Sequence, residues 1–457
     1  MSQYDVIVIG AGPAGEVAAG RLAERGRSVA LVERELVGGE CSFYACMPSK
    51  ALLRPGELLA EAARVPGAAE VVDGRGVDAA AALRRRDEVI HERSDDAQMP
   101  WLQQRGIALV RGQARLDGER RVRVGEDLHE AREAVILATG STALIPPIPG
   151  LREAEPWTNR EATTAGEVPK RLVVLGGGVA GVELAEAWRS LGAEVTIVEA
   201  AERLIAREEP FASEQVAEVL LARGVALALG ARATAAERGA DGRTTLTLED
   251  GAEIAGDRLF VAIGRRPNTD DLGLETLDLE PGKPIEVDDA LRVPRHPWLY
   301  AIGDVNGRAQ LTHMGKYQAR VATDAICGDP SARLRVDGPL SPRAIFTDPA
   351  VAAVGHTLAS AQEAGIAARA VDLDTDSTAG ASFHGRGAPG TTRFVLDDER
   401  ELLVGATFVG PDVAELLHAA TVAIACEVPL AALAHAVPVF PTRSELWLEL
   451  LESRADA

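Results

Sequence analysis

The stretch YDVIVIGAGPAGEVAA, residues 4–19, decides how the chain begins to fold. An apolar strand runs into an alanine-rich helix through three glycines, Gly10, Gly12 and Gly15. The first glycine permits a tight turn, the second lets a phosphate approach the backbone, and the third lets helix and strand pack closely. The next strand, SVALVE, ends at Glu33, whose carboxylate would hold a ribose. Glycines also serve ordinary turns, but strand, glycines, helix and acid in this order indicate a dinucleotide site.

The same pattern returns in RLVVLGGGVAGVELAEAWRSLGAEVTIVE, which starts at Arg171. Its glycines are Gly176, Gly178 and Gly181, and its second strand ends at Glu199. Two nucleotide sites are therefore predicted. A carboxylate at the end of this strand accepts hydrogen bonds from a free 2′-hydroxyl and repels a 2′-phosphate, so the second site should favour NADH over NADPH.

Arg203 is the residue that could weaken this preference for NADH. An arginine at this position could reach a 2′-phosphate. The alternative is a solvated or acid-paired side chain within AERLIAREE, and we expect that alternative because charged side chains are mostly exposed.

Another motif, GGECSFYACMPSK at residues 38–50, contains two cysteines, Cys41 and Cys46. Five residues along an ideal helix would separate their Cα atoms by about 7.5 Å of rise and point the side chains apart, beyond the reach of a disulfide. Cys41 is therefore predicted in the turn before a helix. Because Pro48 is tolerated only in the first turn of a helix, that helix should begin near Cys46, where the helix dipole favours a thiolate.

The close pair could instead be two buried free cysteines or half of a zinc site. Zinc needs more ligands nearby, and the sequence offers none, so no metal site is predicted. The other two cysteines, Cys327 and Cys426, stand alone in alanine-rich contexts that indicate core packing. In a reducing compartment the close pair is therefore interpreted as catalytic.

Composition limits the class of protein. The chain has 457 residues, enough for three domains, and a formal net charge of −21 without a basic cluster. This charge argues against a nucleic-acid or anionic-membrane partner. No signal peptide precedes the first strand near Tyr4, and no apolar run approaches the roughly 20 residues of a membrane span, so we expect a cytoplasmic protein.

Strand and helix patterns predict an α/β fold with four segments. Alternating elements fill residues 1–149, with a charged helical stretch around 83–104, and three prolines then mark a boundary near Gly150. The similar phrases ILATG and VAIG mark passages between domains, which makes the second nucleotide-binding domain, 150–266, an insertion in the first. The first domain resumes over 267–332. From 333 to 457 the separated strands AIFTDPAVAAVG, RFVLDD and LVGATFVG, followed by the helical DVAELLHAATVAIACEV, indicate an α+β interface domain.

These motifs together resemble the flavoprotein disulfide reductases, the pyridine nucleotide-disulfide oxidoreductase family of dihydrolipoamide dehydrogenase, glutathione reductase and mercuric reductase. The resemblance spans essentially the whole chain and rests on phrases in the family's order: GAGPAG, GGECSFYACMPSK, ILATG, GGGVAGVE, VAIGRRPN, YAIGDV, FTDPAVAAVG and FPTRSE.

The resemblance implies a function for each motif. FAD would bind the first domain and Asp304, which on the residues alone could also be a plain turn aspartate, and NAD(P)H would bind the second. Cys46 would form the thiolate against the flavin, and Cys41 would exchange with substrate. Lys50 and Glu183 would pair beside the flavin's reactive nitrogen. The cofactor-binding residues would also include Gly140, Gly264 and Gly303, and the last domain would form a homodimer.

Two departures from the family pattern fall on the thiol chemistry. The family has His-Pro-Thr and then Ser-Glu near the C-terminus, whereas this chain has Phe440 in place of the histidine and retains Glu445. Phenylalanine cannot carry a proton, and a positioned base is worth about 10²–10⁴-fold in rate. His435 is the nearest candidate substitute, and we expect it to be a surface or packing residue. Glu40 replaces the usual threonine, and its carboxylate should disfavour a thiolate at Cys41 if the two are close.

Three functions therefore compete. An NADH-dependent reductase of a disulfide is favoured by the intact cysteine pair. A reductase of a non-disulfide acceptor, such as a quinone, a metal ion or oxygen, is favoured by Phe440. A catalytically inert flavoprotein that serves as a binding subunit is disfavoured while Lys50, Glu183 and both cysteines remain. The sequence does not identify the acceptor, because one fold hosts many substrates.

Overall fold

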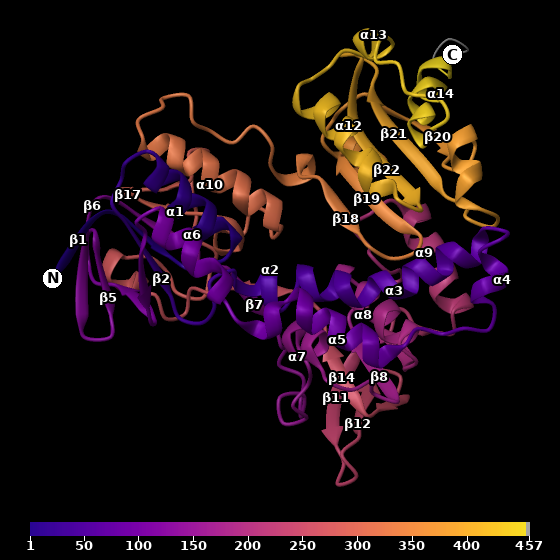
Figure 1. The fold of residues 1–457 in the computed structure, drawn as a ribbon, viewed down its shortest axis with the longest axis horizontal. Coiled ribbons are helices and arrows are strands. Elements are labelled where there is room, and N and C mark those ends of the chain that lie inside the picture. The colour runs from indigo at the N-terminus through magenta and orange to yellow at the C-terminus, as the bar shows by residue number, and fades with distance from the viewer. Residues whose placement is uncertain (454–457) are drawn as a thin grey trace. The chain divides into compact units, whose positions relative to one another are not determined.

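The computed structural model describes residues 1–453, drawn from indigo to yellow along the chain in Figure 1. Its internal contacts divide the chain into two compact units. The first unit comprises Met1–Pro48, Asp87–Leu144 and Gly264–Gly338. The second comprises Ser49–Arg86, Ile145–Ile263 and Pro339–Ala457.

An eight-stranded sheet forms the centre of the first unit. Its main path runs β16-β17-β6-β1-β2-β3, and β1 pairs in parallel with both β2 and β6. The strands are β1 (Ser2–Ile9), β2 (Val29–Glu33), β3 (Ala108–Arg111), β4 (Ala114–Leu116), β5 (Arg121–Val124), β6 (Asp127–Leu137), β16 (Arg292–Val293) and β17 (His296–Ala301). A separate antiparallel pair joins β7 (Ser141–Ala143) to β15 (Arg265–Pro267).

The middle of β1 is a continuous apolar run because both faces of a parallel strand are covered. Val6, Ile7 and Val8 are fully buried. Two helices, α1 (Pro13–Glu24) and α10 (Thr312–Ile326), lie against each other beside the sheet (Figure 1). The remaining helices of this unit are α2 (Gly39–Phe43), α6 (Met99–Gln104), and the short 3-10 helices η1 (His91–Arg93), η2 (Asp96–Gln98), η3 (Leu274–Leu277) and η4 (Gly303–Asn306).

The second unit contains a four-stranded parallel sheet in the order β10-β9-β8-β14. These strands are β8 (Arg171–Leu175), β9 (Glu194–Val198), β10 (Ala226–Ala228) and β14 (Arg258–Val261), and a meander follows of β11 (Ala233–Arg238), β12 (Thr244–Leu248) and β13 (Glu253–Gly256). Its helices are α3 (Cys46–Arg64, which starts in the first unit), α4 (Ala69–Val72), α5 (Ala79–Val89), α7 (Asn159–Thr164), α8 (Val179–Ser190) and α9 (Pro210–Ala222). Trp188 anchors the core, fully buried and donating to the Ala162 carbonyl at 3.0 Å.

The C-terminal part of this unit is a five-stranded antiparallel sheet with helices, as the sequence predicts. The strands are β18 (Arg343–Ile345), β19 (Ala350–Gly355), β20 (Ala368–Asp374), β21 (Thr391–Asp397) and β22 (Leu402–Gly410). The helices are α11 (Leu358–Glu363), α12 (Val413–Ala425), α13 (Leu430–Leu433), α14 (Leu446–Glu452), η5 (Gly338–Leu340), η6 (Ala379–His384) and η7 (Arg443–Glu445). Phe394 and Phe408 pack edge to face at its centre.

The helical stretch predicted around 83–104 is helical in several pieces, with a break after α5. Helix α5 ends at Val89, and the backbone then takes positive φ at three successive residues, among them Glu92 at +50°. Such angles are incompatible with a right-handed helix. Beyond the break, the buried Asp95 accepts the Val37 amide at 2.7 Å and pairs with Arg111.

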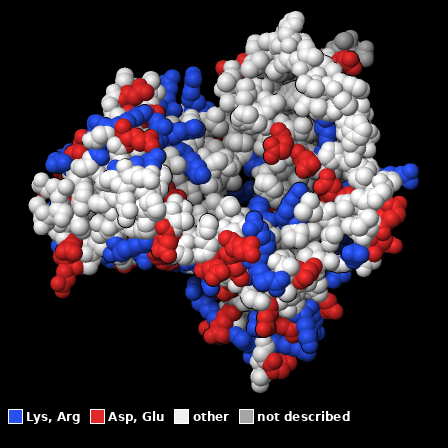
Figure 2. All heavy atoms as spheres, in the orientation of Figure 1, with Lys and Arg blue, Asp and Glu red and all other residues white. Residues whose placement is uncertain are grey.

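The charge pattern agrees with the composition. Figure 2 shows Lys and Arg interspersed with Asp and Glu on the face in view, and few charges over α12. None of the helices within residues 1–453 combines the length and apolar content of a membrane span.

Candidate active site

The first glycine turn is shaped by atoms that leave no space for a side chain. A Cβ on Gly10, whose φ is +100°, would lie 2.3 Å from the Ala138 carbonyl oxygen, and one on Gly15 would lie 1.9 Å from the Gly10 oxygen. By contrast, Gly12 has open space at its Cβ position, and as N-cap of α1 it makes no side-chain cap bond. The first amides of α1 are therefore available to an anion, which fits the pyrophosphate of FAD.

Two further segments complete this turn. The Glu33 carboxylate accepts the Ala11 amide at 2.7 Å, so the predicted ribose-binding acid also holds the glycine turn in place. The Gly38 amide donates to the Ala11 carbonyl at 2.8 Å, and a Cβ on Gly39 would lie 2.8 Å from the Gly12 Cα. The start of the cysteine motif thus lies directly against the phosphate-binding turn.

The two cysteines of the motif are brought together by a break between two helices. Helix α3 begins at Cys46, as predicted, but Cys41 lies in the five-residue helix α2 and not in a turn. The helix ends at Tyr44, whose φ of −138° redirects the chain. The two thiols are hydrogen-bond partners; this hydrogen bond, followed by burial, raises the pKa of Cys41 above its ordinary value.

Thr312, which the sequence analysis missed, also contacts this pair. Its Oγ1 lies 3.4 Å from the Cys46 sulfur. The residue is the first of α10, so the side chain is presented by a helix N-terminus, where negative charge is favoured. The only sequence signal was a helix beginning soon after Asp304, and 266 residues separate the two partners.

A buried amide joins this helix to the segment that carries Asp304. Gln318 is fully buried in α10, and its Oε1 accepts the Gly303 amide at 2.7 Å and the Asn306 side chain at 2.9 Å. Asp304 in η4 accepts the Ser141 hydroxyl at 2.5 Å, and burial raises the pKa of this carboxyl. The predicted ribityl-binding residue is thus placed beside the same helix as Thr312.

Glu40 has a cationic neighbour that the sequence did not reveal. Its Oε2 lies 3.5 Å from Arg265 Nη2, and Arg265 also donates to the Ser141 hydroxyl and carbonyl, each at 2.7 Å. This contact weakens the field that Glu40 was expected to exert on the Cys41 thiol. Next to Arg265 and Ser141, Gly264 and Gly140 take positive φ and accept the amides of Leu144 and Asn268, each at 3.0 Å.

The second glycine turn repeats the first within a tenth or two of an ångström. A Cβ on Gly176 would lie 2.5 Å from the Ala262 oxygen, and one on Gly181 would lie 2.0 Å from the Gly176 oxygen. Gly178 again has open space and no side-chain cap bond. Its acid, Glu199, accepts the Gly177 amide at 2.6 Å. This turn also fits a nucleotide pyrophosphate.

Arg203 is half-buried and hydrogen-bonded within its own segment. It donates to the carbonyls of Glu208 and Ala206, at 2.9 and 2.6 Å, and to the Ser213 hydroxyl at 2.6 Å. The side chain was expected to be solvated or paired with an acid; it stays partly exposed, and these contacts are to carbonyls and a hydroxyl. A guanidinium with three such contacts would have to break them to reach a 2′-phosphate.

Lys50 and Glu183, predicted to pair, are 2.6 Å apart. Glu183 in α8 is buried, and its second oxygen accepts the Phe346 amide at 2.9 Å. The Lys50 ammonium also lies 4.8 Å from the centre of the Phe346 ring. Lys50 is four residues after Cys46 on α3, so both side chains lie on one face of that helix.

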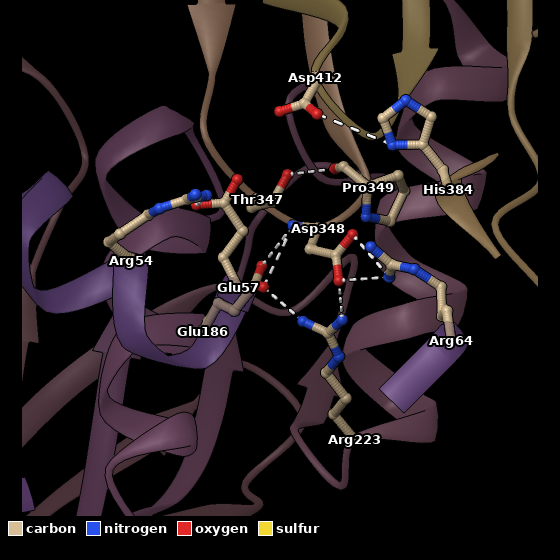
Figure 3. Close-up of polar contacts among 10 residues, drawn as sticks. All are labelled: Arg54, Glu57, Arg64, Glu186, Arg223, Thr347, Asp348, Pro349, His384 and Asp412. Atoms are coloured by element: carbon tan, nitrogen blue, oxygen red, sulfur yellow. Dashed lines mark hydrogen bonds and ion pairs between the residues drawn. The ribbon is translucent and has the colours of Figure 1, made fainter. Parts of the chain in front are cut away.

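One turn further along α8, Glu186 belongs to an ion-pair network that sequence reasoning missed. Figure 3 shows Arg223 between Glu186 and Asp348, with Arg64 on the other side of Asp348. Arg64 Nη1 lies 2.9 Å from Asp348, and the Asp348 amide donates to Glu186 at 3.1 Å. The network joins α8, α9, the C-terminal end of α3 and the Thr347–Pro349 segment.

The C-terminal motif presents an exposed aromatic ring and a partly buried acid. Phe440 is 72% exposed, and Val437 and Val439 nearby are 79% and 73% exposed. Glu445 has one carboxylate oxygen, Oε2, that is buried without a hydrogen-bond partner among the described residues. His435 is exposed, as expected.

The two isolated cysteines, Cys327 and Cys426, differ in their exposure. Cys327 is half-buried, but Cys426 is exposed, so its assignment to the core is wrong. It directly follows α12, whose outward side also carries the exposed Val422.

Three potential metal-ligand atoms, from Glu61, His384 and Asp412, lie within 4.8 Å of one another, and Figure 3 shows the side chains of His384 and Asp412 facing each other.

Comparison with known proteins places this geometry in a family. The family model described as pyridine nucleotide-disulphide oxidoreductase matches residues 4–319, and that of its dimerisation domain matches residues 341–451. A dihydrolipoyl dehydrogenase of Haloferax volcanii is 33% identical over 462 residues, covering 98% of this chain and 96% of that protein. A mercuric reductase of Staphylococcus aureus is 30% identical over 426 residues, covering 92% of this chain and 77% of that protein.

Solved structures agree. The HOCl-induced flavoprotein disulfide reductase RclA from Escherichia coli superposes with a TM-score of 0.86 at 25% identity, over 98% of this chain and 99% of that one. LpdA from Mycobacterium tuberculosis gives a TM-score of 0.86 at 26% identity over the whole of both chains. With two glycine turns that fit a pyrophosphate, an adjacent cysteine pair and these matches, the chain belongs to the pyridine nucleotide-disulphide oxidoreductase family, whose members depend on a flavin and a pyridine nucleotide.

Proposed function

We propose that this protein is an NADH-dependent flavoprotein reductase that delivers two electrons to the Cys41–Cys46 disulfide and from there to a disulfide-type substrate. FAD, when bound at the first glycine turn, would take a hydride from NADH and supply both electrons to the pair. The observation that carries the proposal is the contact between the two cysteines, with Thr312 against one of them. We place the reaction in the cytoplasm, where such a pair stays reducible.

The chain's own residues divide the thiol chemistry between them. Cys46, with the Thr312 hydroxyl and the N-terminus of α10 beside it, would hold the thiolate. Cys41, whose pKa is raised, would pass its proton to the departing half of the substrate as its sulfur attacks the other half, which forms a mixed disulfide and releases one substrate thiol. The Cys46 thiolate would then attack the Cys41 sulfur of this mixed disulfide, release the second substrate half as a thiolate and restore the Cys41–Cys46 disulfide.

The nicotinamide preference rests on the second site. Glu199 would accept hydrogen bonds from the 2′-hydroxyl of NADH in addition to the Gly177 amide, because each carboxylate oxygen has two lone pairs. Arg203 is engaged by two carbonyls and a hydroxyl and is therefore poorly placed to compensate a 2′-phosphate.

The test is anaerobic reduction of the holoenzyme with one equivalent of NADH or dithionite. The reduced enzyme should show the long-wavelength absorbance of a thiolate beside oxidised flavin, and Cys46→Ser should abolish it. Thr312→Val should weaken the band and shift its pH midpoint upward, since the hydroxyl contact is lost. Cys426→Ser, which removes an exposed cysteine outside the pair, is the matched control. Full flavin reduction with the disulfide still intact would disprove the relay.

A second candidate function is favoured by Phe440, which supplies no proton where the family pattern has a base. In that case electrons would pass from the flavin or the dithiol to a non-disulfide acceptor, namely a quinone, a metal ion or oxygen. A steady-state panel with NADH and lipoamide, glutathione disulfide, an aromatic disulfide, quinones and metal ions separates the two candidates. Turnover of quinone or metal alone would favour the second.

The same panel can be run on Phe440→His. Because Glu445 is present to orient an imidazole, this variant should raise disulfide turnover at least about tenfold and leave quinone reduction unchanged. Phe440→Tyr is the control for a changed ring without a base. Flat disulfide turnover in a normally assembled enzyme would mean that Phe440 does not occupy the base position or that the pocket excludes these disulfides.

We further propose that the protein acts as a homodimer through its C-terminal domain. The dimerisation-domain match and the exposed Val422, Val437, Val439 and Phe440 support this arrangement. In a two-fold dimer the 440–445 segment of each subunit would face the cysteine pair of the other, which gives two equal sites. Sedimentation of wild type and of Val422→Glu measures the assembly; a monomeric active wild type would exclude it.

A further inference from the structure

A charged cluster in the first unit joins Asp304 and Glu40 to Arg265, which has no role in the electron transfer proposed above. Glu40 lies 3.5 Å from Arg265, Arg265 donates to Ser141 through two nitrogens, and the Ser141 hydroxyl donates to Asp304 at 2.5 Å. Arg265 Nε is also 3.9 Å from the Asp304 carboxylate. One guanidinium thus faces two carboxylates, and the cluster has one positive charge for two negative ones when both acids are ionised.

The backbone places Glu40 next to the phosphate-binding turn. The two residues before it lie against that turn, since the Gly38 amide donates to the Ala11 carbonyl at 2.8 Å and a Cβ on Gly39 would be 2.8 Å from the Gly12 Cα. Gly12 is the N-cap from which the open amides of α1 would receive a pyrophosphate. A carboxylate one residue further on therefore approaches the region that the anionic ligand would occupy.

A carboxylate near the pyrophosphate would repel it, and partial burial of the cluster would reduce the solvent screening of that repulsion. The side chains of Glu40 and Arg265 are 24% and 25% exposed, so the pair is mostly withdrawn from water. Arg265 is fixed by its two bonds to Ser141, and its Nη2 lies 3.5 Å from the Glu40 carboxylate. Glu40 therefore uses part of the positive potential of Arg265 without fully cancelling its own charge.

We propose that the Glu40–Arg265 pair is part of the FAD site and limits how tightly the pyrophosphate of FAD is held. Arg265 supplies positive potential to the dinucleotide, and Glu40 lowers that potential. The inference rests on the proposed binding of FAD at the first glycine turn. On this inference, the glutamate that replaces the family's threonine at position 40 affects how tightly the flavin is bound, in addition to any effect on the Cys41 thiol.

The test measures the dissociation constant of FAD by titrating the apoprotein, prepared by removing the flavin, and following the loss of flavin fluorescence. Glu40→Gln should lower the dissociation constant at least fivefold, and Arg265→Met should raise it at least tenfold. Glu35→Gln is the matched control, because this exposed acid on the same connection lies 3.8 Å from Arg34 and not beside Arg265. The control should leave the constant unchanged.

Thermal unfolding of each apoprotein separates binding from folding. Arg265→Gln, which removes the charge but keeps a hydrogen-bond donor, replaces Arg265→Met if the latter does not fold. An unchanged or raised dissociation constant in folded Glu40→Gln overturns the inference, whereas a wild-type apoprotein that binds no FAD overturns the proposed function itself. Raising the salt concentration should weaken FAD binding less in Arg265→Met than in wild type, since one cationic contact is missing; equal salt dependence would contradict the role of Arg265.

Discussion

The two glycine turns have nearly the same local geometry and very different surroundings. Their third glycines, Gly15 and Gly181, would place a Cβ 1.9 and 2.0 Å from a carbonyl oxygen. In the first turn, Gly12 is half-buried, because the cysteine motif lies against it, and α10 packs on α1. In the second, Gly178 is exposed, and so is the next residue, Val179, at 45%.

We infer from this difference that the glycine fingerprint sets the kind of ligand, while the neighbouring segments set how fast that ligand dissociates. A covered helix N-terminus suits a cofactor that stays bound, and an open one suits a cofactor that leaves after each turnover. We expect FAD to dissociate slowly from the first site and NADH rapidly from the second.

The largest effect is expected when the third glycine of each turn is replaced by alanine. In Gly181→Ala the backbone must move away from the Gly176 oxygen, so the KM for NADH should rise at least about 100-fold, or about 2.7 kcal/mol, with flavin content unchanged. Gly15→Ala should instead yield protein without flavin. Visible spectra and NADH titrations measure both effects. Gly166→Ala, with nothing within 4 Å of its Cβ position, is the control. Loss of flavin from Gly181→Ala would refute the independence of the two turns.

The two turns also differ in one titratable group, the Glu16 carboxyl of the first turn. Glu16 follows the third glycine of the first turn, where the second turn has the buried Val182. Burial raises the pKa of Glu16 from 4.5 to about 7, against an opposing effect of Lys316. The folded protein therefore binds this proton more tightly than the unfolded chain does. Its stabilising contribution is complete below pH 4.5 and is lost as the pH rises to about 7.

The free energy of unfolding should consequently fall by about 1–3 kcal/mol between pH 5 and 8 through this group. Glu16→Gln should flatten that part of the profile, and Glu24→Gln, an exposed acid on the same helix, should not. Urea unfolding at several pH values gives the comparison. An equal slope in Glu16→Gln and wild type would assign the pH dependence to other groups.

The smallest effect concerns the nucleotide's ribose. With Glu199 at the second site, kcat/KM for NADH should exceed that for NADPH at least tenfold, or about 1.4 kcal/mol. Glu199→Gln keeps an acceptor for the Gly177 amide but removes the charge, so the ratio should narrow. Glu194→Gln on the same strand is exposed and serves as the control. Equal efficiencies in wild type would show that Arg203 leaves its present contacts to bind a 2′-phosphate.

How much the sequence could predict depended on the distance along the chain between partners. The strand–turn–helix order at each glycine motif and the start of α3 follow from residues less than 30 apart, and these local structures are confirmed, whereas the cofactor roles of the glycines and acids stay predictions. The Lys50–Glu183 pair was predicted only through the family resemblance. The contacts of Thr312 with Cys46 and of Arg265 with Glu40 join residues 266 and 225 positions apart, and no local sequence pattern predicts them.

The wrong predictions also have physical reasons. Cys41 was assigned to a turn because a single helix cannot bring the two cysteines together, but the short helix α2, a break at Tyr44 and the long helix α3 achieve the same approach. Cys426 was assigned to the core from its alanine-rich context. Its side of α12 is uncovered in the single chain, and small apolar residues do not tell a core from an interface.

The buried amide of Gln318 has a mechanical consequence. Its oxygen ties the turn that carries Asp304 to the helix that begins with Thr312, and its nitrogen has no partner among the described residues. Asp304 and Thr312, on either side of a bound flavin, would then belong to one rigid element. Thermal motion could move this element as a whole, but it would hardly change the distance between Asp304 and Thr312.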